Sequence, residues 1–139
     1  MTTLVHVPVS LLPQVLRATR NWLLRILETR PGWMTEAQAV EWLLADKFQL
    51  HLALDENHTA LAALVTELRQ SPAGMKICDI VGIAGINRHL WMDHLEGMEK
   101  WARAEGCSGI RIKNGRKGWL REERLKPYRV SFEFERSLP

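Results

Sequence analysis

The sequence has only two cysteines, Cys78 and Cys107, and they lie far apart in a chain of 139 residues. Two thiols at this spacing are too few and too far apart for a disulfide framework or for a four-ligand zinc site. No His-Glu-x-x-His or Cys-x-x-Cys motif occurs, and His89 and His94 would lie about 140° apart around a helix. We therefore expect reduced thiols and no metal site.

Long apolar runs are also missing, since none approaches the roughly 18–20 residues of a membrane-spanning helix. The first residues lack the basic and then apolar segments of a secretory signal. Hydrophobic residues make up 46% of the chain and charged residues 25%, which is ordinary for a globular protein. These features predict one cytoplasmic domain, residues 1–139, with no membrane partner.

Net charge is small, because 19 basic and 16 acidic residues leave an excess of +3. The excess is concentrated between residues 111 and 129, which carry many basic residues but only Glu122 and Glu123 as acids. Such a segment can attract an acidic protein face, a phosphorylated ligand or nucleic acid, or it can simply be a solvated surface. Tryptophan and arginine are enriched at protein interfaces, whereas one aromatic residue is little for binding single-stranded nucleic acid. We therefore predict a protein-binding surface, with nucleic acid less favoured, at Arg116, Lys117, Trp119, Arg121 and Arg124.

Apolar periodicity predicts the secondary structure along the chain. Helical spacing indicates helices over 12–29, 36–44 and 87–104, the second of them behind a Thr35-to-Gln38 capping pattern. Alternating apolar residues indicate strands over 4–9, 48–54, 60–68, 76–83, 108–113 and 128–136, with a short helix over 118–125. Strands in a meander, followed by strands joined through helices, predict an α+β fold with a mixed sheet.

Four segments of the C-terminal half carry a family resemblance. They are Met98 to Cys107 (MEKWARAEGC), Ile110 to Ile112 (IRI), Gly115 to Trp119 (GRKGW) and Tyr128. In this order they resemble the N-acetyltransferase (GNAT) superfamily, and more narrowly the small GNAT-like proteins of tailed bacteriophages and prophages. The resemblance spans roughly residues 76–138 and implies a mostly antiparallel central sheet flanked by helices.

The resemblance also implies a place for acetyl-CoA. In the superfamily a loop of pattern Gln/Arg-x-x-Gly-x-Gly/Ala, between a strand and a long helix, binds the pyrophosphate through backbone N–H groups. In this sequence Gly82 falls at the Gln/Arg position, Gly85 at the first glycine and Asn87 at the last small residue. Arg88 follows and could supply the missing positive charge.

The catalytic residues implied by the resemblance are harder to find. Active members commonly have a Tyr in the short helix after the fifth strand, and residues 118–125 contain none. Tyr128 falls at a later aromatic position that packs under the last strand. Glu67, Asp79 and His51 on the middle strands are the available general bases, and no sequence feature marks one of them.

Two functions therefore remain open. The preferred hypothesis is a GNAT-fold phage or prophage protein without acetyltransferase activity or cofactor, acting as a structural or interaction module in virion assembly or host takeover. Its partners would be phage structural proteins or further copies of itself, in the cytoplasm of the bacterial host or in the virion. The alternative is an acetyl-CoA-dependent N-acetyltransferase.

Overall fold

The computed structural model describes residues 2–30, 32–86, 90–112 and 127–129. Within these ranges the strands form one sheet in the order β1-β2-β3-β4-β5, antiparallel throughout except for the parallel pair of β4 and β5. The strands are β1 (Thr3–His6), β2 (Phe48–Leu54), β3 (Ala60–Gln70), β4 (Lys76–Gly85) and β5 (Gly109–Ile112). The predicted α+β architecture is confirmed. The helix expected over 118–125 and most of the strand expected over 128–136 lie outside the described residues.

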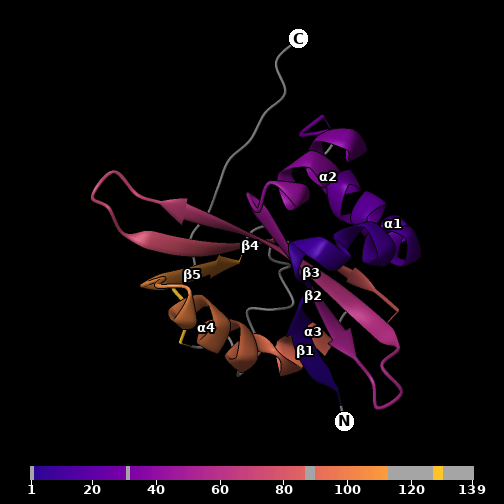
Figure 1. Ribbon diagram of the computed structural model, residues 1–139. Helices are drawn as coiled ribbons and strands as arrows, with labels where there is room; N and C mark the ends of the chain where they lie inside the picture. Colours follow the sequence, from indigo (N-terminus) through magenta and orange to yellow (C-terminus); the bar gives the residue numbers. More distant parts are fainter. Residues whose placement is uncertain (1, 31, 87–89, 113–126, 130–139) are drawn as a thin grey trace.

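Helices cover both faces of the sheet (Figure 1). The first face carries α1 (Leu12–Glu28) and α2 (Glu36–Leu44), and the second carries α3 (Leu90–Asp93) and α4 (Leu95–Ala104). Each face has its own apolar cluster, around Phe48, Leu50 and Val65 on the first face and around Leu64, Ile80 and Met98 on the second. None of these helices is long and apolar enough to cross a membrane, which holds for the described residues only.

The first helices begin where local sequence signals place them. Pro13 lies in the first turn of α1, where a missing backbone N–H costs nothing. At α2 the predicted capping box is present: the Gln38 N–H donates to Thr35 Oγ1 at 3.1 Å, and the Thr35 N–H donates to Gln38 Oε1 at 2.9 Å. The predicted strand over 4–9 is wrong at its end, because β1 stops at His6 and a short 3-10 helix, η1 (Val9–Leu11), follows Pro8. Proline has no N–H to continue the strand's hydrogen bonding.

The helix predicted over 87–104 is interrupted. The described part consists of α3 and α4, separated at His94, whose φ of −104° and ψ of 7° depart from helical values. The His94 ring is hydrogen-bonded through Nε2 to Thr2 Oγ1 at 2.7 Å. The interruption thus coincides with a contact to Thr2, near the N-terminus. A pattern of apolar residues cannot reveal such a distant contact.

Candidate functional site

Strand β4 contains a bulge near its centre. The register with β3 shifts between the pairs Val65–Gly82 and Thr66–Ile80, so Val81 is an extra residue on β4. Beyond the bulge, β4 continues to Gly85, whereas its described pairing with β5 covers only Ile77–Ile80. A bulge leaves one residue out of the ladder and bends the strand, and bulges are over-represented beside active sites. This half of β4 is therefore the first place to look for a site.

Two glycines of the predicted acetyl-CoA loop lie on this half of β4. Gly82 is inside the strand, paired with Val65 and beneath α1, where a Cβ atom would collide with the Ile26 side chain. Gly85 ends the strand with a φ of +148°, and a Cβ atom there would lie 2.5 Å from the Ala62 Cα. Both positions exclude any side chain. Asn87 and Arg88 lie outside the described residues, so the assignment of these four residues to a cofactor stays a prediction.

A row of charged residues crosses the strands just before the bulge. Glu67 on β3 is paired with Asp79 on β4, and Asp79 with Arg111 on β5. The Arg111 guanidinium donates to both carboxylate oxygens of Asp79, from Nε at 2.6 Å and from the terminal nitrogen at 3.0 Å. Arg69 Nε donates to Glu67 at 2.8 Å and lies 3.6 Å from Asp79. These bonds with Asp79 raise the pKa of Arg111.

Asp79 is the buried member of this row, with no exposed side-chain surface, while Arg69 and Arg111 are half exposed. A fork of two parallel hydrogen bonds to a carboxylate is the strongest geometry for such a pair. Two of the three predicted base candidates, Glu67 and Asp79, are thus brought together, and each is bound to an arginine. Spacing alone could not reveal this pairing, since Arg111 lies 32 residues from Asp79.

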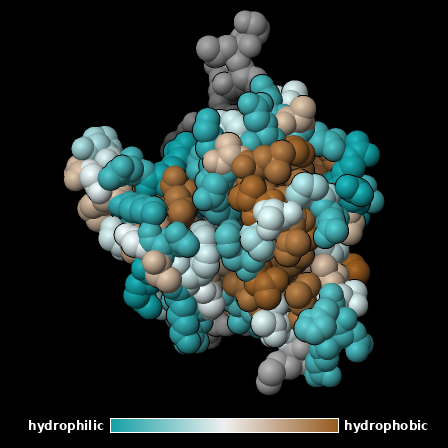
Figure 2. Space-filling model, viewed as in Figure 1, coloured by the Kyte–Doolittle hydropathy of each residue, from teal (hydrophilic) through white to brown (hydrophobic). Residues whose placement is uncertain are grey.

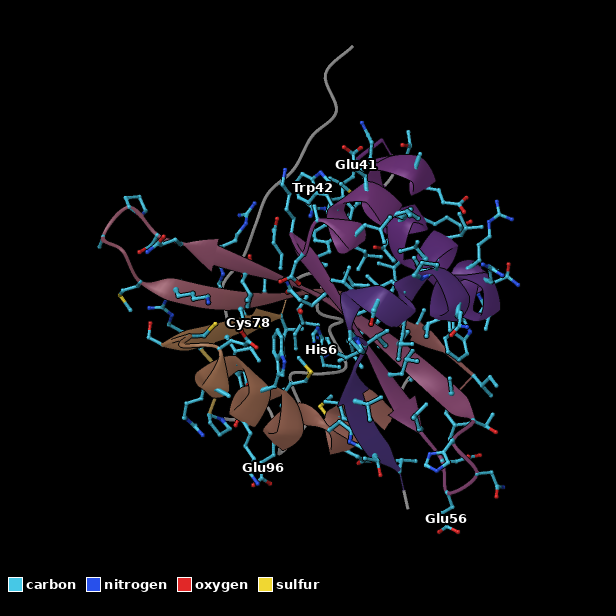
Figure 3. All side chains as sticks on the ribbon, viewed as in Figure 1. His6, Glu41, Trp42, Glu56, Cys78 and Glu96 are labelled. Atoms are coloured by element: carbon cyan, nitrogen blue, oxygen red, sulfur yellow. The ribbon has the colours of Figure 1, made fainter. Side chains whose placement is uncertain are left out.

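The third base candidate, His51, lies on the other face of the sheet. It is buried beneath α4, where its ring lies 4.5 Å from that of Trp101 and 5.2 Å from that of His6. Figure 3 labels His6 on β1, on the side of the sheet that α4 covers. The structure does not bring His51 to the charged row.

A buried hydrogen-bond chain fixes the His51 ring. The Thr66 hydroxyl donates to Gln49 Oε1 at 3.0 Å, so its oxygen accepts from His51 Nε2–H, also at 3.0 Å. The Gln49 amide donates in turn to the Asp46 carbonyl at 2.9 Å. Burial, reinforced by the charge of His6, lowers the pKa of His51 to about 3. The ring is therefore neutral at physiological pH and holds β2 to β3.

Tyr128 and Cys78 lie in the packed interior. Tyr128 lies against the apolar cluster of the second face, and its hydroxyl donates to Glu99 Oε1 at 2.6 Å. Burial and this bond raise the pKa of Tyr128. Burial also raises the pKa of Cys78 to about 12, so its thiol stays protonated and poorly nucleophilic. In Figure 3 Cys78 lies inside the molecule, whereas Glu96 projects outward from α4.

The remaining sequence predictions concern partners and metals. Arg116, Lys117, Trp119, Arg121 and Arg124 all lie outside the described residues, so the partner surface predicted there stays a prediction. Across the described ranges, no three His, Cys, Asp or Glu residues are arranged to hold a metal ion.

Solved structures match this architecture from end to end. An aminoglycoside acetyltransferase from an uncultured soil metagenomic sample aligns with a TM-score of 0.69 at 14% identity, over 99% of this chain and 97% of its own. The chain has the GNAT fold. A ribosomal-protein-alanine N-acetyltransferase from Brucella melitensis aligns with a TM-score of 0.63 at 8% identity, over 99% and 97% of the two chains.

A further GNAT acetyltransferase, an aminoglycoside 6'-N-acetyltransferase from Acinetobacter baumannii, aligns over 100% of both chains with a TM-score of 0.56 at 11% identity. At such identities the likeness shows the GNAT fold and not a shared activity. The sequence itself matches no family model and no curated protein.

Proposed function

We propose that the protein is a GNAT-fold protein of a tailed bacteriophage or prophage that acts as a structural or interaction module without acetyltransferase activity. The observation that carries the proposal is the helix after β4. Its first described segment, α3, has only four residues, and the chain leaves helical geometry at His94. A pyrophosphate at a helix N-terminus is stabilised by free N–H groups and by the summed dipole of a continuous helix. The interruption at His94 separates α4 from the part of the helix nearest β4, so α4 adds little to the dipole there.

The packing at Gly82 supports the same proposal. The superfamily pattern has a glutamine or arginine at this place, whose side chain would contact the cofactor. Here the Ile26 side chain of α1 occupies the space that any side chain would need. The contact is therefore absent for a structural reason, and a single substitution in the chain would not restore it.

The base candidates are also engaged in other interactions. A general base must reach the proton it removes and be free to accept it. Asp79 is held by Arg111 and Glu67 by Arg69, while His51 is buried with a pKa of about 3. Each would have to give up an existing bond, or come out from beneath α4, before it could act.

One observation favours the second candidate, an acetyl-CoA-dependent N-acetyltransferase. The bulge at Val81 lies two residues from Asp79, whose carboxylate is a base candidate. The fold is shared over nearly the whole chain with solved acetyltransferases. In this case a carboxylate of the charged row would serve as base, and Gly85, Asn87 and Arg88 would contact the pyrophosphate.

The phage or prophage origin is supported by the sequence resemblance in four segments: 98–107, 110–112, 115–119 and Tyr128. A protein of this origin would be made in the cytoplasm of the bacterial host, and the virion would be a second location. Its partners would then be phage structural proteins or further copies of itself.

Calorimetric titration of acetyl-CoA and of CoA into the purified protein separates the two candidates. The module should give no heat of binding at micromolar concentrations. Micromolar affinity for acetyl-CoA would overturn the proposal. An Arg88→Ala variant, with Arg103→Ala as the matched control on α4, would then show whether that affinity comes from the expected loop.

A further inference from the structure

A shallow groove of about 250 Å³ lies between α1 and α2, on the side of these helices that faces solvent. Its floor is apolar, and charged side chains stand at its rim. The apolar residues are Pro13, Leu16, Leu23, Val40 and Leu44, and the charged ones are Arg17, Arg20 and Glu36. Leu44, at the end of α2, is 45% exposed.

The groove belongs to a larger apolar surface. Figure 2 shows a continuous hydrophobic patch over α2, η1 and the start of α1. Val9 and Leu11 of η1 contribute to the exposed apolar surface, at 41% and 47% exposure. Exposed apolar patches rimmed by polar residues mark sites that bind proteins, membranes or ligands.

The size of the groove argues against a small-molecule ligand. Pockets for cofactors and drug-sized ligands usually measure roughly 300–1,000 Å³ and enclose most of the ligand. A shallow groove between two helices instead suits the apolar side chains of a third helix, spaced three or four residues apart.

The charges at the rim restrict which helix can bind. Arg20 is bound to Glu36 through a fork of hydrogen bonds at 2.6 and 3.0 Å, whereas no ion pair or hydrogen bond of Arg17 is found within the described part of the chain. Arg17 therefore favours a carboxylate on the partner. A second copy packed groove to groove would offer Arg17 no free carboxylate, because Glu36, the acidic residue lining the groove, is already bound to Arg20.

We propose that the α1–α2 groove binds an amphipathic helix of a partner protein, with apolar anchors between α1 and α2 and a carboxylate facing Arg17. This inference rests on the proposed function as an interaction module, and it names the surface and the chemistry of the partner. The groove is separate from the basic segment between residues 111 and 129.

Two synthetic helical peptides with the same leucine spacing test the proposal, one with glutamates on its polar face and one with lysines. Fluorescence anisotropy with the full-length protein should show at least about tenfold tighter binding of the acidic peptide. Leu44→Glu should abolish binding, and Arg17→Glu should reverse the preference between the peptides. Met75→Glu, at an exposed apolar residue in the β3–β4 turn, is the matched control and should bind as the parent does.

Equal binding of both peptides, absence of binding up to millimolar concentration, or an unchanged affinity in Leu44→Glu would overturn the proposal. A dimer in analytical ultracentrifugation that Leu44→Glu dissociates would assign the groove to a second copy and overturn it as well. Acetyl-CoA binding is measured separately. A protein that binds acetyl-CoA and still selects the acidic peptide would refute the proposed function while leaving this site in place.

Discussion

The backbone of Gly82 lies directly against the side chain of Ile26, so that α1 rests on β4 with no room for even one methyl group between them. The Ile26 Cβ would be only 3.0 Å from a Cβ at Gly82, and its Cγ2 would be closer still. Gly82→Ala should therefore force α1 away from the sheet. Overpacking of this kind costs about 1–3 kcal/mol of unfolding free energy, measurable by urea denaturation.

Gly109→Ala is the matched control for Gly82→Ala, because Gly109 is also in a strand and nothing lies within 4 Å of a Cβ there. It should leave stability nearly unchanged. A double-mutant cycle with Ile26→Ala should show coupling between the two sites, since the shortened side chain makes room for the new methyl. Equal stability of the two glycine variants would contradict the packing described.

Acid should destabilise the protein through His51. The unfolded chain binds a proton at a pKa near 6.5, whereas the folded protein keeps His51 neutral down to about pH 3. Between these values the unfolded state binds more protons, so stability falls as the pH falls below about 6.5. The slope approaches about 1.4 kcal/mol per pH unit from this one group.

Urea denaturation at pH 7 and at pH 5 measures the contribution of His51. The parent protein should lose unfolding free energy between pH 7 and pH 5. In His51→Gln this loss should be smaller by up to about 2 kcal/mol, whatever the variant's stability at pH 7. The control is His58→Asn. His58 is exposed, and asparagine tolerates the φ of +62° at this position. An unchanged pH dependence in His51→Gln would contradict the buried neutral ring.

Arg111→Lys should destabilise the protein although it keeps the charge. A lysine ammonium cannot make the two parallel hydrogen bonds that Arg111 makes with buried Asp79. Because Arg111 is half exposed and partly screened by solvent, we expect a loss of about 1–2 kcal/mol rather than the larger cost of breaking a fully buried pair. The measurement is the thermal denaturation of Arg111→Lys. The control is Arg25→Lys, a substitution on the exposed side of α1. Equal melting temperatures would show that the fork contributes nothing.

Thr35→Ala should remove the cap of α2 and cost about 1 kcal/mol, because the Gln38 N–H loses its acceptor. Thr35→Ser keeps that acceptor and should retain most of the stability. If both variants lost the same amount in urea denaturation, the hydroxyl would not be the source of the effect.

Local signals made much of the fold predictable. The capping box of α2 lies within four residues, and the strand from Phe48 to Leu54 follows from simple alternation. The alternation was incomplete as a guide to burial, however. Gln49 and His51 occupy the positions that should face solvent, yet both are buried, and Trp101 of α4 covers His51 on that face.

The candidate site was less predictable, because it depends on contacts between distant residues. The interruption at His94 coincides with a hydrogen bond to Thr2, and the position of Asp79 depends on Arg111 from another strand. The bulge at Val81 is a property of the pairing between β3 and β4 and not of either strand alone. Gly82 fitted the spacing of a cofactor motif, yet its place beneath Ile26 could be known only once α1 was positioned on the sheet.

The order of the sheet has a consequence for biosynthesis. From β2 to β5, each described strand pairs with the strand that precedes it in the sequence, so pairing up to β4 can proceed while the chain leaves the ribosome. The parallel strand β5 can join only after the crossover through α3 and α4 is complete. Until then the outer edge of β4, with Ile77, Cys78 and Ile80, offers unpaired backbone groups of the kind on which chains aggregate. A translational pause just after β4 should therefore lower the yield of soluble protein, whereas the same pause after β5 should have less effect.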